Sequence, residues 1–277
     1  EKTARLNDYA KKVGIEIKSP KFRHSKSDYY LDKEQNFIYK GIGSIKFMNE
    51  NVAKELFNLG TKKYSNFIDL MIDIKNCTNI NSRQLDILIK LDFFSEFGDI
   101  NELLRIIDIF DIVHGKKQFR KDKLFEMGLT NEDISPFAEK ETDKMFSKVD
   151  SYGLIKHIVS SERKTNPITL IEKIKYQLEY LGYIDIKSKE YQGYTVVLSL
   201  TTKYAPKLKL YALANGNVLN VKIDRKTFYS NIVNTGDIIR IINFCYKPKS
   251  KRNDDGSYTK IDGTKEIWLK EYKKAIL

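Results

Sequence analysis

The spacing of apolar residues changes near Tyr191, and this change constrains the fold more than any other feature of the chain. Before it, apolar residues recur every three or four positions, as they do in amphipathic helices. After it, residues 194–204, 207–223 and 237–249 alternate apolar with polar side chains, as strands with one buried face do. We therefore expect a multi-domain α+β chain in which a small helical domain precedes an antiparallel β domain.

Four segments carry the helical pattern, and they lie at 49–60, 64–74, 81–94 and 99–115. Asn49 is a suitable N-cap for the first, and either Ser65 or Asn66 for the second. Short turns separate the four segments, so they predict a compact helical domain. Two further helices are expected to meet at Pro167.

The alternating segments predict a small closed barrel. Asn215 and Gly216 form a strong hairpin signal between two of them. Four or five antiparallel strands, with a short helix over 226–233, match a barrel of the OB type.

The charge is strongly positive and concentrated at one end. The chain has a formal net charge of +12, and residues 189–277 hold 17 Lys and Arg against 8 Asp and Glu. A basic domain of this kind often binds a polyanion, so nucleic acid is the expected partner. A composition that is simply rich in lysine would give the same total.

Several functional classes find no support in the sequence. No stretch approaches the roughly 18 apolar residues of a membrane span, and Cys77 and Cys245 are too few and too far apart for a zinc site or a disulfide framework. Phosphate-loop, dinucleotide-binding and nucleophile-elbow motifs are not found, nor are clustered carboxylates. We therefore expect no catalytic residue, metal or cofactor, and a reducing cytoplasmic location. A start without Met suggests a piece of a longer protein.

The order of motifs resembles a known family. Residues 11–46, "KKVGIEIKSPKFRHSKSDYYLDKEQNFIYKGIGSIK", are similar to a helix, a strand closed by Pro, a Ser-containing loop and a strand into "GLG-x-IK" in bacterial C-family replicative DNA polymerases. Residues 80–104, "INSRQLDILIKLDFFSEFGDINELL", and 177–186, "QLEYLGYIDI", resemble later segments of the same proteins, the DNA polymerase III alpha subunits.

The resemblance implies the part of the polymerase that follows its catalytic palm. Residues 1–38 would end a fingers-like segment, 39–115 would be a tandem helix-hairpin-helix region, 116–188 a helical linker and 189–277 the OB domain. The helical region would hold duplex product and the barrel single-stranded template. The catalytic carboxylates would lie upstream, so this chain is expected to be inactive alone. The location would be the nucleoid or, for a phage-encoded protein, the bacterial cytoplasm.

The hairpin glycines of that family are replaced here. Phe47-Met48-Asn49 stands at the first glycine pair, and Asp92 at the second hairpin. Because Asn and Asp tolerate positive φ best, we expect it at Asn49 and Asp92. The predicted duplex-binding side chains are Lys46, Asn49 and Asn51, whereas Gly41-Ile42-Gly43 is interpreted as a strand-to-helix turn.

The barrel segment mixes aromatic and basic residues, as single-strand binders do. Tyr211 and Phe244 are expected in its core. The predicted single-strand-binding residues are Lys203, Tyr204, Lys207, Arg240, Tyr246, Lys247, Lys249, Lys251 and Arg252.

Two alternatives concern proteins as partners. The family has a clamp-binding pentapeptide, and Met145 and Phe146 keep its Met-Phe pair while the Gln is missing. The sliding clamp or clamp-loader subunits would then be partners. More broadly, the chain could be a replisome interaction scaffold whose hairpin DNA contacts are lost.

Overall fold

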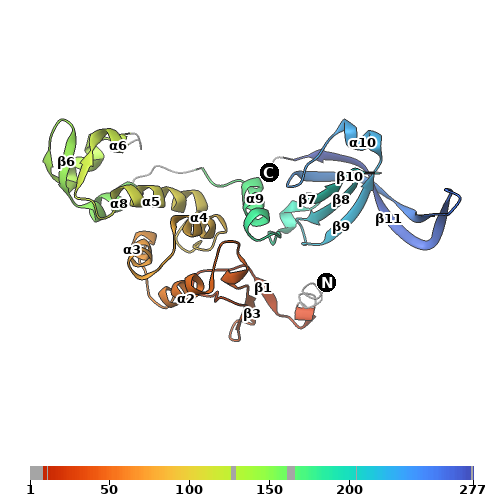
Figure 1. Ribbon diagram of the computed structural model, residues 1–277, viewed down its shortest axis with the longest axis horizontal. Coiled ribbons are helices and arrows are strands. Elements are labelled where there is room, and N and C mark those ends of the chain that lie inside the picture. Colours follow the sequence, from red (N-terminus) through yellow and green to blue (C-terminus); the bar gives the residue numbers. More distant parts are fainter. Residues whose placement is uncertain (1–8, 11, 126–128, 161–165, 204, 276) are drawn as a thin grey trace. The chain divides into compact units, whose positions relative to one another are not determined.

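The computed structural model describes the chain apart from residues 1–8, 11, 126–128, 161–165, 204 and 276. The chain divides into two compact units, Glu1–Ile168 and Thr169–Leu277, each described by itself (Figure 1). Residues 3–14 have the apolar spacing of a helix, but most of them fall outside the described residues. Within the described part, no helix has the length and apolar character needed to span a membrane.

The first unit begins with a three-stranded sheet followed by helices. The sheet has the order β1-β3-β2, with β1 parallel and β2 antiparallel to β3. The elements are β1 (Glu16–Lys18), β2 (Tyr30–Asp32), β3 (Phe37–Tyr39), the 3-10 turn η1 (Ile42–Ser44), α2 (Glu50–Leu59), α3 (Phe67–Cys77), α4 (Ser82–Lys90) and α5 (Ile100–Val113). The four predicted helices are confirmed, and each is capped by an Asn or Asp side chain: Asn49, Asn66, Asn81 and Asp99.

The rest of this unit contains a second small sheet, so the expectation of a helical linker over 116–188 is wrong for residues 118–149. Its order is β4-β6-β5. The elements are β4 (Gln118–Arg120), α6 (Lys121–Phe125), α7 (Asn131–Ile134), η2 (Ser135–Phe137), β5 (Ala138–Glu141), β6 (Met145–Val149) and α8 (Ser151–Ser160). Its strands are too short for a clear alternating pattern. Helix α8 packs on α5, and the Tyr152 hydroxyl donates to Asp69 on α3 at 2.6 Å.

A loop before the helices holds the helical part together. The Phe22 side chain is 2% exposed, and its ring contacts Tyr64, Phe93, Phe94 and Phe97. Burying a phenylalanine of this kind contributes roughly 1.5–3 kcal/mol.

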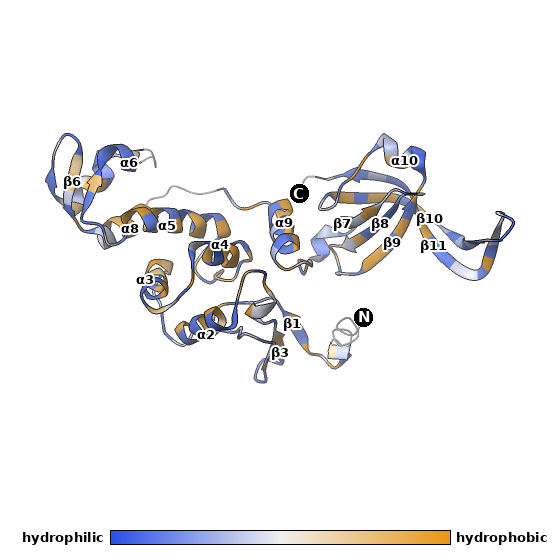
Figure 2. Cartoon of the chain, viewed as in Figure 1, coloured by the Kyte–Doolittle hydropathy of each residue, from blue (hydrophilic) through white to orange (hydrophobic). Residues whose placement is uncertain are grey.

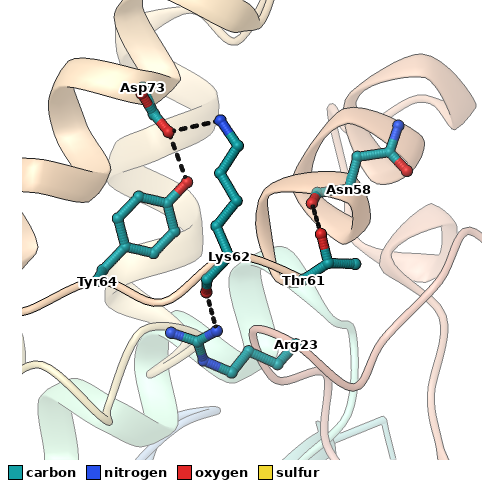
Figure 3. A network of polar contacts seen from close by, with 6 residues as sticks. All are labelled: Arg23, Asn58, Thr61, Lys62, Tyr64 and Asp73. Atoms are coloured by element: carbon teal, nitrogen blue, oxygen red, sulfur yellow. Dashed lines mark hydrogen bonds and ion pairs between the residues drawn. The ribbon is translucent and has the colours of Figure 1, made fainter.

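Arg23 extends this loop's contacts by hydrogen bonds. Its guanidinium donates to the carbonyls of Gly60 and Lys62 after α2, at 2.8 and 2.5 Å, and to the Glu96 carboxylate at 2.8 Å. Figure 3 shows the neighbouring network, in which Lys62 and Tyr64 both donate to Asp73. The hydrogen bonds from Lys62 and Tyr64 hold the pKa of Asp73 below its ordinary value.

The second unit is a helix packed on a closed five-stranded barrel with the order β10-β11-β9-β8-β7. Its elements are α9 (Leu170–Tyr180), η3 (Lys189–Tyr191), β7 (Tyr194–Thr201), β8 (Lys207–Ala212), β9 (Val218–Ile223), α10 (Arg225–Ser230), β10 (Ile238–Arg252) and β11 (Tyr258–Lys274). Neighbouring strands are antiparallel except β9 and β11, which are parallel. The predicted turn between β8 and β9 is confirmed, with Gly216 at φ +76°.

The barrel has two packed regions. One fills its interior and includes Val197, Leu210 and Ile239. The other joins Ile174 of α9 to Val196 and Tyr211 on the barrel wall. Strands β10 and β11 continue beyond the barrel as a two-stranded ribbon (Figure 1). This ribbon is mostly hydrophilic (Figure 2).

We predict that Gly41→Ala destabilises the first unit. A Cβ at this position would overlap the Ser27 carbonyl oxygen and lie 2.7 Å from the Asp28 carbonyl carbon, so backbone would have to move. Overpacking of this kind costs about 1–3 kcal/mol. Thermal denaturation should show the loss for Gly41→Ala and a smaller one for Gly43→Ala, whose Cβ would lie 3.0 Å from the same oxygen. Equal melting temperatures for the two variants would contradict this reading.

Candidate nucleic-acid interface

The glycine pair between β3 and α2 is a turn whose amides are already used. The Ile42 amide donates to the Lys26 carbonyl at 2.8 Å, and the Gly43 amide to the Ser27 carbonyl at 3.0 Å. Gly41 is required because the backbone at Ser27 and Asp28 passes so close to it. The interpretation as a strand-to-helix turn is therefore confirmed, and these two amides are not free for a phosphate.

The N-terminus of α2 offers free amides instead. The Asn49 side chain accepts from the Val52 amide at 2.9 Å, and the Asn49 carbonyl accepts from Ala53. The two earlier amides, of Glu50 and Asn51, have no acceptor among the described residues. Such amides, together with the helix dipole, favour an anion. The predicted side chains Lys46, Asn49 and Asn51 are all exposed at this helix end.

The expected positive φ at Asn49 is wrong. Asn49 has φ −133° and ψ 170°, the extended backbone that an N-cap needs in order to reach the third amide of its helix. The left-handed residue is Phe47, with φ +68°. The second expectation is confirmed, since Asp92 has φ +63°. The role of Asn49 in this hairpin is thus to cap α2.

Helix α4 holds the Phe47 hairpin from its own first turn. The buried Gln84 side chain donates to the Phe47 carbonyl at 2.9 Å, and its oxygen accepts from the Asn81 amide at 3.1 Å. The Arg83 guanidinium lies over the Phe47 ring, 3.8 Å from its centre. The first hairpin and α4 therefore form one local structure, although 37 residues separate Phe47 from Gln84.

The second hairpin, between α4 and α5, is tied to the Phe22 loop. Lys21 donates to the Asp92 carbonyl at 2.5 Å and to Ser95 at 2.6 Å, and its ammonium lies 3.6 Å from the Asp92 carboxylate. The Phe22 amide donates to the Phe93 carbonyl. These contacts join parts of the protein to one another, so this hairpin has a structural role here.

The barrel carries a cluster of aromatic and basic side chains. The pairing register aligns Lys207, Lys222 and Trp268 across β8, β9 and β11. The Lys247 ammonium lies 3.9 Å from the centre of the Trp268 ring. Lys222 pairs with Glu266 at 2.6 Å, and Glu266 also accepts from the Trp268 indole at 2.8 Å.

This cluster unites two of the predicted residues, Lys207 and Lys247, with Trp268 and Lys222. The sequence marks Trp268 as one of the barrel's aromatic residues without selecting it as a binding residue, and it gives no signal for Lys222. A cross-strand row could have been found only from the pairing register, because its members are far apart in sequence.

The other predicted barrel residues lie on exposed surface. Tyr246 is 60% exposed, and Arg240 lies over the Tyr194 ring at 5.6 Å. Lys203, Lys249 and Lys251 are exposed. Tyr204 and the Arg252 side chain lie outside the described residues.

One core expectation for the barrel is confirmed and one is wrong. Tyr211 is buried, but Phe244 is 48% exposed and packs edge-to-face against Tyr246. Register shifts between Ile241 and Phe244 break the alternation along β10. A bulge of this kind re-aims the side chains that follow it, so the period-2 pattern assigned Phe244 to the wrong face.

The pair proposed for a clamp is not presented to a partner. Met145 and Phe146 begin strand β6 instead of lying on a short helix, and Phe146 is 0% exposed. Because the Phe146 side chain is buried, a clamp could not contact it. Among the described residues, no cluster of three or more His, Cys, Asp or Glu could hold a metal ion.

The family model of the helix-hairpin-helix motif matches residues 14–102. These residues run from just before β1 into the first turn of α5, so both hairpins lie inside the match. No curated protein matches the chain in sequence. Helix-hairpin-helix domains generally bind DNA, and the match supports a nucleic-acid-binding domain in this part of the chain.

We predict that Gln84→Met destabilises the first unit by about 1–3 kcal/mol. Methionine preserves the volume but leaves the Phe47 carbonyl and the Asn81 amide without their partner, and an unsatisfied buried group costs about that much. Urea denaturation followed by circular dichroism measures the change. Arg83→Met, which removes only exposed stacking, should cost less; a larger effect at Arg83 would contradict the assignment.

Proposed function

We propose that this chain is a non-catalytic DNA-binding portion of a C-family replicative DNA polymerase, in which the helical region holds duplex and the barrel holds single-stranded template. The observation that carries the proposal is the helix-hairpin-helix match over residues 14–102, which overlaps two of the three segments that resemble the polymerase, 11–46 and 80–104. The order of the two units along the chain is the order that the resemblance implies. We retain divisions after residues 38, 115 and 188 as part of this proposal.

The strand order supports an OB assignment for the barrel. Numbered from β7, the strands follow the order 1-2-3-5-4, the third and fifth are parallel, and α10 lies between the third and fourth. This is the arrangement of the five-stranded OB barrel, a fold that commonly binds oligonucleotides. The cluster of Lys207, Lys222, Lys247 and Trp268 and the exposed pair Phe244–Tyr246 supply the cationic and stacking groups that single strands require.

If the first hairpin holds duplex DNA, a negative charge introduced at Asn49 should weaken duplex binding. Serine and aspartate both cap helices as well as asparagine does, so Asn49→Ser and Asn49→Asp should melt close to the unchanged protein. Only aspartate adds a negative charge beside the amides of Glu50 and Asn51. Asn49→Asp should therefore weaken binding to a blunt duplex about fivefold at low salt, roughly 1 kcal/mol. Fluorescence anisotropy with a labelled duplex measures this.

Asn49→Ser is the matched control and should bind like the unchanged protein. Lys46→Ala should lower the duplex affinity by about as much as the loss of one phosphate contact does, without changing sequence preference. If Asn49→Asp binds duplex as tightly as Asn49→Ser, this helix end does not face the phosphates.

The single-strand side makes a salt prediction at the ribbon. Affinity for an oligothymidylate should fall with salt, with a log–log slope near −0.7 for each phosphate neutralised. Changing Lys247, Lys249, Lys251 and Arg252 together to Ala should weaken binding and flatten that slope. Titrations from low to moderate salt measure both quantities, and binding that does not respond to salt would refute the proposal.

The scaffold alternative predicts no DNA binding in either experiment. It is favoured by the replaced hairpin glycines and by the hydrogen bond and ion pair that join Asp92 to Lys21 within the protein. A chain that binds neither duplex nor single strands at low salt would support that alternative.

A further inference from the structure

Phe47 is an unusual residue for the place it occupies. A bulky side chain at positive φ costs free energy that glycine would avoid. The ring is nevertheless 52% exposed at the tip of the first hairpin, so its burial does not repay the strain. Strain kept at an exposed position motivates a search for function there.

Two residues of α4 contact Phe47. The Arg83 guanidinium covers one face at 3.8 Å, and Gln84 fixes the backbone by its hydrogen bond to the Phe47 carbonyl. With this contact in place, the residue is still 52% exposed. Lys46 is the preceding residue and is exposed, so one cationic residue precedes Phe47 in the chain and another, Arg83, lies over its ring.

We infer that Phe47 stacks on an unpaired base, backed by Arg83, so that the first hairpin recognises an interruption in duplex DNA as well as its backbone. This deepens the proposed function and rests on it. A paired base presents no free face to the ring, whereas an extruded or unpaired base does. Aromatic stacking of this kind is tolerant of sequence, and the flanking cations attract the nearby phosphates.

The test compares two DNA duplexes, one fully paired and one with a single unpaired 2-aminopurine. The unchanged protein should bind the interrupted duplex about tenfold more tightly, which is within the contribution of one base–aromatic stack. Fluorescence of the 2-aminopurine should change on binding. Phe47→Gly should bind both duplexes equally and lose the fluorescence change. Phe47→Asn, which also tolerates positive φ, is a second variant without the ring.

Two control variants separate this inference from general DNA binding. Tyr29→Ala removes another exposed aromatic ring of the same unit and should leave the tenfold ratio unchanged. Lys46→Ala should weaken both duplexes by the same factor. If the unchanged protein binds both duplexes equally, or if both Phe47 variants keep the preference, the inference fails while duplex binding stands. If no duplex binds, the proposed function fails as well.

Discussion

The burial of the Phe22 ring among Tyr64, Phe93, Phe94 and Phe97 joins the loop before the helices to the second hairpin and to the segment between α2 and α3. The residues on either side of Phe22 add hydrogen bonds to this contact. Lys21 donates to the hairpin after α4, and Arg23 donates to carbonyls at the end of α2. One short loop thereby joins the second hairpin to the end of α2. The first hairpin is held separately, by the hydrogen bond from the Gln84 side chain to the Phe47 carbonyl.

Each hairpin contains one residue at positive φ, Phe47 in the first and Asp92 in the second, but the two hairpins have different roles. Asp92 turns its carbonyl and carboxylate toward Lys21, so its polar groups are satisfied inside the protein. The first hairpin keeps the free amides of Glu50 and Asn51, an exposed lysine and an exposed ring at its surface. These contacts give the Asp92 hairpin a structural role, and the first hairpin is the one that we propose to bind DNA.

Local signals predicted much of both units. The caps at Asn49 and Asn66, the Asn215-Gly216 turn and the alternation in β7 to β9 all depend on residues a few positions apart. The sequence therefore located helices, strands and the exposed lysines. It failed at Phe244, where a bulge shifts the alternation, and at Phe146, where three short strands form a sheet that no periodic pattern marks.

By itself, the sequence determined the four capped helices, the alternating strands of the barrel and the order of the units, because these follow from intrinsic backbone and side-chain preferences. Tertiary structure alone decided which groups are free. The Ile42 and Gly43 amides are occupied because residues 26–27 pass beside them, and Phe47 takes the left-handed turn while Gln84, 37 residues away, holds its carbonyl. A hydrogen bond to a distant partner leaves no mark in local spacing, and it is such bonds that separate a turn from a binding surface.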